Sequence, residues 1–539
     1  MRVLYHNSQI ARLPKSTTPP QAAGYQKSIP YWIPAFAGMT RRRKRRGIKP
    51  KLSNKSTMTV RITILGAGPG GYMAAIKAAH LGAEVTVIEN DRLGGTCLNR
   101  GCIPTKTIKS SAEALDIARR LSEFGITAEG GFKPDMPAII ARKEKVVSIL
   151  VKGIESLFKS NKIRLIKGKG TLLSPTRVKV EGLDGSISEV EGDKLILATG
   201  SRVMSLPDFP LDGETIISSD EAVFLNEIPA EILIIGGGVV GAEFAFILNA
   251  LGSKVTIVEA MDRLLPIPSI DGDTSKILQR EMKKRKIKLY LNKTVVRTEK
   301  TPDGKIKAII GPSPFLNEVN EKDRIEAEVS ADKVLVSIGR KFNTEGLGLE
   351  QVGVELDARG WIPVNDQLET SIPGIFAIGD VLGPARNMLA HVASAEALVA
   401  AENCFGADRT MDYRVVPSGI FTFPEIGSVG LSEEQARAQG LNYRADSFNF
   451  RGLGKSQAMG ELPGHVKIVS NAENGRILGG HIIGPHATDL VAEIAVAIKL
   501  DASVKDLADT IHLHPSLSEA VMEAAHAASD ECLHLPPKK

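Results

Sequence analysis

The sequence predicts an α/β fold that contains two parallel sheets of similar construction. A glycine-rich turn occurs twice, at 66–71 and at 236–241, each time between an apolar, β-branched run and a helix-forming run. A second apolar run follows each of these helices and ends in an acidic residue, Glu89 or Glu259. This order of strand, turn, helix and strand, with an acid about 20 residues beyond the turn, is typical of Rossmann-like dinucleotide-binding units.

Each glycine of the first unit has a distinct structural role. Gly66 permits the tight turn, Gly68 lets the backbone approach a pyrophosphate, and Gly71 lets the helix pack against the strand. The helix N-terminus then faces the negative charge of the ligand. We expect Glu89, at the end of the second strand, to bind a ribose hydroxyl. The strand, helix and second strand are predicted at 60–65, 73–81 and 85–89.

The second unit repeats the pattern and predicts a second dinucleotide. One glycine-rich turn arises by chance far more readily than two complete units, so we interpret the pair as two binding sites. Glu259 favours NAD over NADP, because a carboxylate pairs with the ribose 2′-hydroxyl and repels a 2′-phosphate. Its glycines are Gly236, Gly238 and Gly241, which lie between a strand at 232–235 and a helix that continues to Leu251.

Two cysteines, Cys97 and Cys102, lie in the run 94–106 just downstream of the first glycine-rich turn. Structural disulfides are expected mainly in small secreted chains, whereas this chain has 539 residues and four cysteines. The pair would contribute little to folding a chain of this size. We therefore interpret it as a redox disulfide that works beside a cofactor.

Two further apolar strands end in residues that suit a bound cofactor. The run 195–200 ends in Thr199-Gly200, and the run 374–380 ends in Gly379-Asp380. Either one alone would be an ordinary strand end.

Length and composition predict a protein of several domains that neither spans a membrane nor binds nucleic acid. Its longest apolar stretches fall far short of the roughly 18 residues needed to cross a bilayer. The net charge of +6 is misleading, because residues 1–57 carry thirteen of the 68 basic residues and none of the 62 acidic ones. The remainder, with 55 basic and 62 acidic residues, has a net charge of −7 and no excess of basic residues for nucleic acid.

Residues 1–57 are predicted to be a disordered basic extension. Met58 leads directly into the first strand, so we interpret it as the biological start and the preceding segment as a mis-assigned extension. The predicted location is the cytoplasm. The alternative is the mitochondrial matrix, because an arginine-rich segment without acids weakly resembles an organellar transit peptide.

At this point the chain resembles the flavoprotein disulfide reductases over nearly all of 58–539, and most closely the members that oxidise dihydrolipoamide. The resemblance implies FAD at the first glycine-rich turn, NAD at the second, a small central domain, and a C-terminal α+β dimerisation domain that forms a homodimer. The motifs that carry it are 66–71, 94–106, 236–241, 337–340, 379–380, 388–391 and 512–520.

The resemblance also implies roles for the redox residues. Cys97 is the thiol that exchanges with substrate, and Cys102 faces the flavin as a thiolate. His514 is the base that takes the proton of the substrate thiol, and Glu519 orients its imidazole. His514 and Glu519 of one chain are expected to face Cys97 of the other.

Further positions are implied to bind the two cofactors. Lys106 is expected near the flavin N5, held by Glu243, and Asp380 on the ribityl chain. His512 and His514 alone would be compatible with a metal pair, but no cysteine or acid cluster at ligand spacing supports one, so no metal is expected. The other cofactor-binding positions that the resemblance implies are Gly170, Thr199, Gly200, Gly339 and Ala390.

The resemblance predicts a function and a division into domains. The function is oxidation of protein-bound dihydrolipoamide by NAD, through the disulfide and FAD, in partnership with the lipoyl domains of 2-oxoacid dehydrogenase or glycine cleavage complexes. The alternative is another NAD(P)H-dependent disulfide or metal-ion reductase of the same family. The predicted domains are FAD-binding at 58–205, NAD-binding at 206–335, central at 336–405 and dimer-interface at 406–539.

Overall fold

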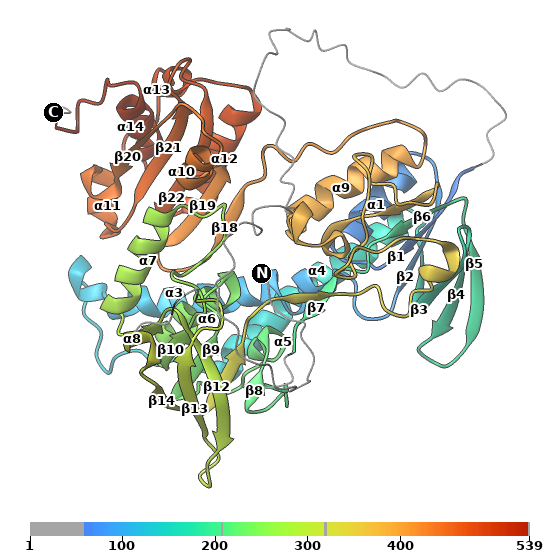
Figure 1. The fold of residues 1–539 in the computed structure, drawn as a ribbon, viewed down its shortest axis with the longest axis horizontal. Coiled ribbons are helices and arrows are strands. Elements are labelled where there is room, and N and C mark those ends of the chain that lie inside the picture. The colour runs from blue at the N-terminus through green and yellow to red at the C-terminus, as the bar shows by residue number, and fades with distance from the viewer. Residues whose placement is uncertain (1–58, 206–208, 317, 319–320, 537–539) are drawn as a thin grey trace, which may run out of the picture. The chain divides into compact units, whose positions relative to one another are not determined.

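The computed structural model describes residues 59–205, 209–316, 318 and 321–536. The predicted N-terminal extension and its proposed start at Met58 lie outside the described residues. Within them the structure confirms an α/β protein with two parallel sheets and a separate C-terminal sheet (Figure 1).

The first sheet is parallel across its centre, and its central strands are apolar, β-branched and buried, as is usual for parallel strands covered on both faces. Buried side chains of the central strand include Ile62 and Ile64. Helices α1 (Pro69–His80) and α9 (Ala390–Asn403) pack against each other beside this sheet (Figure 1). The strand order is β17 (Ile375–Ala377), β6 (Lys194–Leu197), β1 (Arg61–Leu65), β2 (Glu84–Glu89), β3 (Arg164–Ser174), β4 (Arg177–Gly182) and β5 (Ile187–Glu191), the last three pairing antiparallel.

The second sheet repeats the parallel arrangement. Helix α6 (Val239–Leu251) follows its glycine-rich turn and is buried along most of its length. The strand order is β11 (Lys288–Tyr290), β10 (Lys254–Val258), β9 (Glu231–Ile235), β15 (Lys333–Val336) and β8 (Ile216–Ile217). An antiparallel sheet follows β11 in the chain, with the order β12 (Lys293–Lys300), β13 (Ile306–Pro312) and β14 (Ala327–Ala331).

Two crossings connect the sheets. Strands β7 (Ser201–Val203) and β16 (Arg340–Phe342) pair antiparallel, and the chain then returns to the first sheet through β17. The first sheet is therefore completed by residues that follow the second one in the sequence.

The C-terminal sheet is antiparallel and is covered by helices, as an α+β domain requires. Helix α12 (Ala487–Lys499) packs against β19 and β22, and α14 (Glu519–Ala528) packs against β20 and β21 (Figure 1). The strand order is β18 (Ser418–Ile420), β19 (Glu425–Gly430), β22 (Ile477–Gly484), β21 (His465–Asn471) and β20 (Tyr443–Asn449).

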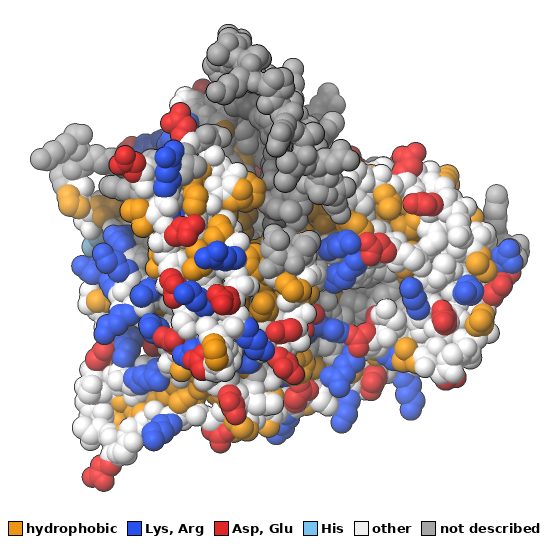
Figure 2. Space-filling view, turned by 60° about the horizontal axis from the view of Figure 1, so that its bottom comes forward, with side chains coloured by type: hydrophobic (Ala, Val, Ile, Leu, Met, Phe, Trp, Pro, Cys, Tyr) orange, Lys and Arg blue, Asp and Glu red, His pale blue; other side chains and the backbone are white. Residues whose placement is uncertain are grey.

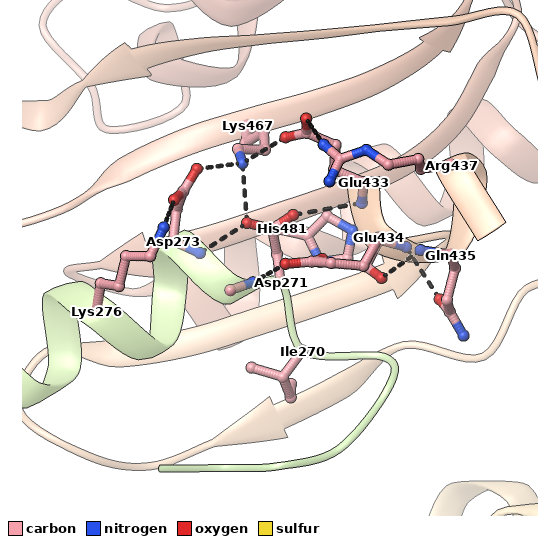
Figure 3. Close-up of polar contacts among 12 residues, drawn as sticks. Ile270, Asp271, Asp273, Lys276, Glu433, Glu434, Gln435, Arg437, Lys467 and His481 are labelled. Atoms are coloured by element: carbon pink, nitrogen blue, oxygen red, sulfur yellow. Dashed lines mark hydrogen bonds and ion pairs between the residues drawn. The ribbon is translucent and has the colours of Figure 1, made fainter. Parts of the chain in front are cut away.

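A buried ion cluster ties the C-terminal sheet to α7 (Gly272–Lys284), the helix that precedes β11 (Figure 3). The buried Lys467 ammonium lies 2.9 Å from Asp271, 2.6 Å from Asp273 and 3.1 Å from Glu433. Three carboxylates around one buried cation compensate its desolvation. The cluster therefore fixes the second sheet region against the C-terminal sheet.

The other helices connect these sheets or cover them. None of the helices in the described part of the chain is long and apolar enough to cross a membrane. On the face drawn in Figure 2, the described basic and acidic side chains are interspersed. The remaining helices are α2 (Gly95–Asn99), α3 (Cys102–Arg119), α4 (Met136–Ser160), α5 (Ser219–Ala222), α8 (Glu321–Arg324), α10 (Glu433–Ala438), α11 (Gly454–Met459) and α13 (Val504–Ala508), with short 3₁₀ turns at Leu121–Phe124, Glu350–Val352, Gly379–Leu382, Pro384–Arg386 and Phe450–Gly452.

Candidate active site

The first glycine-rich turn leaves space where a pyrophosphate would approach. Gly66 has φ +97°, and a Cβ there would lie 2.3 Å from the Ala198 carbonyl oxygen. A Cβ on Gly71 would lie 1.9 Å from the Gly66 carbonyl oxygen. A Cβ on Gly68 would have its nearest neighbour at 4.0 Å, the Gly95 Cα. Chain packing thus requires the outer two glycines, whereas the middle one faces open space at the N-terminus of α1.

The second turn has the same construction. A Cβ on Gly236, at φ +102°, would lie 2.5 Å from the Ser337 carbonyl oxygen, and one on Gly241 would lie 1.9 Å from the Gly236 carbonyl oxygen. Nothing lies within 4 Å of a Cβ placed on Gly238. Both turns therefore fit a dinucleotide by the same test.

The two acids predicted to bind ribose also hold their own turns. Glu89 accepts hydrogen bonds from the amides of Ala67 at 2.6 Å and Asp91 at 2.7 Å. Glu259 accepts from Gly237 at 2.6 Å and Met261 at 2.8 Å. Each carboxylate oxygen keeps a further acceptor site, so a ribose hydroxyl remains compatible with these bonds. Burial raises the pKa of Glu89.

The thiol pair lies where two helices meet. Cys97 is in α2, and Cys102 is the first residue of α3, where the helix dipole favours a thiolate. A hydrogen bond from Cys97 lowers the pKa of Cys102 to about 7; the Lys106 ammonium acts in the same direction, and burial opposes both. The pKa of Cys97 is raised, because its proton is held in that bond and its sulfur is buried. The two thiols therefore differ: the pKa of Cys102 is lowered and that of Cys97 is raised.

Lys106, one turn beyond Cys102, is fixed by Glu243. Its ammonium lies 2.8 and 3.0 Å from the two carboxylate oxygens of Glu243, which is 5% exposed. The Phe421 amide donates to the same carboxylate at 3.0 Å, and the Phe421 ring centroid lies 4.4 Å from the ammonium. Residues of α3, α6 and the C-terminal region therefore converge beside the thiols.

Asp380 is held at the end of β17 by two side chains. The Ser201 hydroxyl donates to it at 2.6 Å, and the Arg340 guanidinium lies 3.7 Å away. Arg340 also donates to the Ser201 hydroxyl at 2.6 Å. This places a carboxylate and a guanidinium at the carboxyl end of the first sheet, where ligands of such sheets bind.

Glu396 is a functional candidate that sequence reasoning missed. This buried carboxylate accepts from the Gly379 amide and from the Tyr413 hydroxyl, each at 2.6 Å. It therefore fixes the residue before Asp380. Burial raises the pKa of Glu396 to about 7.

The remaining predicted cofactor positions lie near the same sheet end. Thr199 exchanges hydrogen bonds with Asn343, and Gly200 and Gly339 adopt φ values of +69° and +137°. Ala390 begins α9. Gly170 lies within β3, where a Cβ would come 3.1 Å from the side chain of Leu65, the last residue of β1.

His514 and Glu519 form a separate pair in the C-terminal domain. The His514 Nδ1 lies 2.8 Å from Glu519, whose other oxygen accepts from the Ser516 amide at 2.7 Å. Burial opposes ionisation of Glu519, but these two bonds hold its pKa below the usual range. The imidazole is 79% exposed, and no polar contact joins it to either thiol in the described chain.

The segment around His514 exposes large apolar side chains. Ile511 and Leu513 are among the most exposed in the described chain. His512, in contrast, is tied down by bonds to the Thr510 carbonyl at 2.7 Å and to Glu493 at 2.6 Å. The described residues contain no cluster of three or more histidine, cysteine or acidic side chains suited to a metal ion.

Comparison with known proteins defines the class. Residues 60–397 match the pyridine nucleotide-disulphide oxidoreductases, and residues 416–525 match the dimerisation domain of the same family. The chain belongs to the pyridine nucleotide-disulphide oxidoreductase family. The matched ranges contain every predicted site residue.

Individual relatives and structures agree with this. The chain is 42% identical to dihydrolipoyl dehydrogenase 1, mitochondrial, from Arabidopsis thaliana, covering 88% of this chain and 91% of that protein. It is 42% identical to dihydrolipoyl dehydrogenase from Chlamydia muridarum, covering 88% of this chain and 98% of that protein. The crystal structure of LpdA from Mycobacterium tuberculosis superimposes with a TM-score of 0.78 at 31% identity, covering 87% and 99% of the two chains. A Cu(II) complex of the flavoprotein disulfide reductase RclA from Escherichia coli gives 0.74 at 25% identity, with 87% and 99% coverage.

Proposed function

We propose that the chain is a dihydrolipoyl dehydrogenase, which oxidises dihydrolipoamide with NAD through Cys97, Cys102 and FAD. The observation that carries the proposal is the thiol pair itself. Cys102 begins α3 beside Lys106, and Lys106 is paired with Glu243 on the helix of the second glycine-rich turn. A thiol with a lowered pKa and a link to the second turn suit electron transfer between a dithiol and a nicotinamide.

The two glycine-rich turns divide the cofactors. FAD binds at the Gly66 turn with Glu89 and Asp380, and NAD binds at the Gly236 turn with Glu259. FAD, when bound, carries two electrons between the thiol pair and nicotinamide. Lys106 supplies the positive charge beside it, and Glu243 holds Lys106 in place.

The substrate is oxidised by thiol–disulfide exchange with the cysteine pair in two steps. One substrate thiolate attacks Cys97 of the oxidised pair, a mixed disulfide forms, and Cys102 leaves as a thiolate. The second substrate thiolate then releases lipoamide and leaves Cys97 reduced. The His514 imidazole accepts the proton of the attacking thiol, and Glu519 orients the ring.

The site is completed across a homodimer. The family assignment of residues 416–525 as a dimerisation domain supports an assembly of two chains. The exposed imidazole of His514 and its apolar neighbours Ile511 and Leu513 then face the partner subunit. In this arrangement His514 and Glu519 of one chain serve Cys97 of the other, so each interface completes two sites.

The partners and compartment follow from this activity. The substrate is the dihydrolipoyl group on the lipoyl domain of a 2-oxoacid dehydrogenase or glycine cleavage complex. The working location is the cytoplasm, or the mitochondrial matrix if residues 1–57 direct import. The related proteins include both mitochondrial and bacterial forms.

A substrate panel tests the proposal and its alternative. The FAD-loaded protein is assayed for NAD reduction with dihydrolipoamide, and for NADH or NADPH oxidation with oxidised glutathione, Hg(II) and Cu(II). Cu(II) is included because the RclA neighbour is a Cu(II) complex. Turnover with dihydrolipoamide well above the other arms supports the proposal, whereas higher turnover with glutathione or a metal ion supports a different reductase of this family.

A further inference from the structure

Helix α3 carries a second lysine, Lys109, on the face that holds Cys102 and Lys106. The three residues are at positions i, i+4 and i+7, so they lie along one side of the helix. Lys109 is 6% exposed, and its ammonium lies 2.9 Å from Glu425 and 3.0 Å from Glu113. Although burial disfavours the charged form, these carboxylates raise the pKa of Lys109, with Glu425 contributing most. Lys109 is therefore a buried cation that bridges α3 to the first residue of β19.

The segment 421–425 lies along this face of α3. Phe421 contacts Lys106 and donates its amide to Glu243. The Phe423 ring centroid lies 5.3 Å from the Lys109 ammonium, and Glu425 binds that ammonium directly. The chain bends at 422–424 before β19 begins at Glu425, and residues 421, 423 and 425 each contact a lysine of α3. One short segment of the C-terminal region thus contacts both lysines of the thiol helix.

The Glu425 carboxylate also holds α12. Its second oxygen accepts from the Thr488 hydroxyl at 2.7 Å and from the Thr488 amide at 3.4 Å, in the first turn of that helix. Farther along α12, Glu493 lies 2.6 Å from His512, two residues before His514. The same carboxylate therefore joins the thiol helix to a helix that contacts the His514 segment, and both belong to one chain.

We propose that Lys109 and Glu425 are a positioning pair that sets α3, and with it Cys102 and Lys106, against the dimerisation domain. The inference rests on the proposed function, which requires that Cys102 face the flavin. Because α3 is a continuous helix of 18 residues, displacement at Lys109 moves Cys102 at its N-terminus. Loss of the Lys109 ammonium removes the cation that Glu425 binds, and loss of the Glu425 charge leaves the buried ammonium with Glu113 alone. Either change breaks the connection between α3 and β19.

The test compares Lys109→Met with Glu113→Gln in the FAD-loaded full-length protein. Methionine keeps most of the aliphatic stem and removes the ammonium. Glu113, the other carboxylate that Lys109 binds, is 44% exposed. Glutamine at this position removes its charge and leaves the ion pair of Lys109 with Glu425 intact. Thermal melting establishes that each variant is folded. The readouts are the long-wavelength charge-transfer absorbance after reduction by NADH, and kcat and KM for dihydrolipoamide.

We expect Lys109→Met to lose at least about half of the charge-transfer absorbance and about 10-fold in kcat with KM little changed, because small misplacement of a reacting group is costly. Glu113→Gln should keep both within about twofold, because Glu113 is half-exposed and the bridge from Lys109 to Glu425 remains. Equal behaviour of the two variants in absorbance and kcat would overturn the proposal. Glu425→Gln should reproduce Lys109→Met, and it replaces that variant if the latter does not fold.

The double variant Lys109→Met with Glu425→Gln tests whether the two residues act as one pair or independently of each other. If the two act as a pair, the double variant loses no more than the worse single one. Additive losses would contradict the proposal. The charge-transfer absorbance is measured after reduction by NADH alone. It therefore still tests the positioning pair if the wild-type protein fails to oxidise dihydrolipoamide.

Discussion

Lys106 and Glu243 are joined by two hydrogen bonds, of 2.8 and 3.0 Å, across 137 positions of sequence. Lys106 lies on the helix that begins with Cys102, and Glu243 lies on the helix that follows the second glycine-rich turn. The contact therefore connects the thiol pair with the region proposed to bind NAD, and it holds a cation beside the sulfur.

The hydrogen bond from Cys97 and the Lys106 cation together predict a pH dependence for Cys102. The pKa of Cys102 is lowered from the usual thiol range to about 7. The thiolate is therefore present above about 7 and lost as the pH falls through it, so the charge-transfer band of the NADH-reduced protein should rise along the same curve. Lys106→Met should move the midpoint to higher pH. Lys152→Met, an exposed position on α4, is the control, and an identical midpoint in both variants would rule out the role of Lys106.

The two cysteines should behave differently when each is replaced. In Cys102→Ser the charge-transfer band is abolished, because the thiolate that faces the flavin is gone. In Cys97→Ser the band should persist, since Cys102 remains, while dihydrolipoamide oxidation is lost. Absorption spectra after anaerobic reduction check both. A band of unchanged intensity in Cys102→Ser would remove its assignment as the flavin-facing sulfur.

The local parts of this site could be predicted from sequence, and the distant ones could not. Strands at 60–65 and 232–235 and both glycine turns follow from short patterns, and the structure has β1 and β9 in these places. The hydrogen bond from the Phe421 amide to Glu243 spans 178 positions and the ion pair of Lys109 with Glu425 spans 316, and no periodicity in the sequence indicates either. Glu396 sits in an alanine-rich helix, where an acid is ordinarily a surface residue.

The sequence also predicts only one of the two roles of Glu89 and Glu259. Their distance from the glycine-rich turns predicts that they bind ribose, but residue types alone do not show which backbone amides point at a side chain. In the structure each acid also accepts hydrogen bonds from two backbone amides of its own turn.

Because Glu259 both faces the ribose site and holds its own turn, its replacement should affect coenzyme choice and coenzyme binding. The wild-type protein should prefer NAD to NADP by a wide margin, because Glu259 repels a 2′-phosphate. Glu259→Ala should narrow the preference by relieving that repulsion, and should also raise KM for NAD, since the turn loses two hydrogen bonds. Steady-state kinetics with both coenzymes measure this. Equal kcat/KM for NAD and NADP in the wild type would refute the assignment.

Replacement of His514 should separate the two halves of the reaction. His514→Ala should slow dihydrolipoamide oxidation by roughly 10² to 10⁴, the usual contribution of proton transfer, while NADH still reduces the flavin. Stopped-flow measurement of each half-reaction checks this. Comparable slowing of both would indicate a structural role.

Subunit mixing tests the shared site. Inactive His514→Ala and inactive Cys97→Ser chains, dissociated and reassociated, should restore about one intact site per heterodimer. No recovered activity, in a preparation shown to contain heterodimers, would indicate that the imidazole acts within its own chain.

The redox state of Cys97 and Cys102 tests the central claim most directly. The FAD-loaded protein is quenched in denaturing iodoacetamide before NADH, after one equivalent of NADH, and after subsequent lipoamide, and its peptides are weighed by mass spectrometry. We predict a Cys97–Cys102 disulfide at first, two alkylated thiols after NADH, and the disulfide again after lipoamide, with Cys404 and Cys532 alkylated throughout. Cysteines 97 and 102 in the same state before and after NADH would contradict the account.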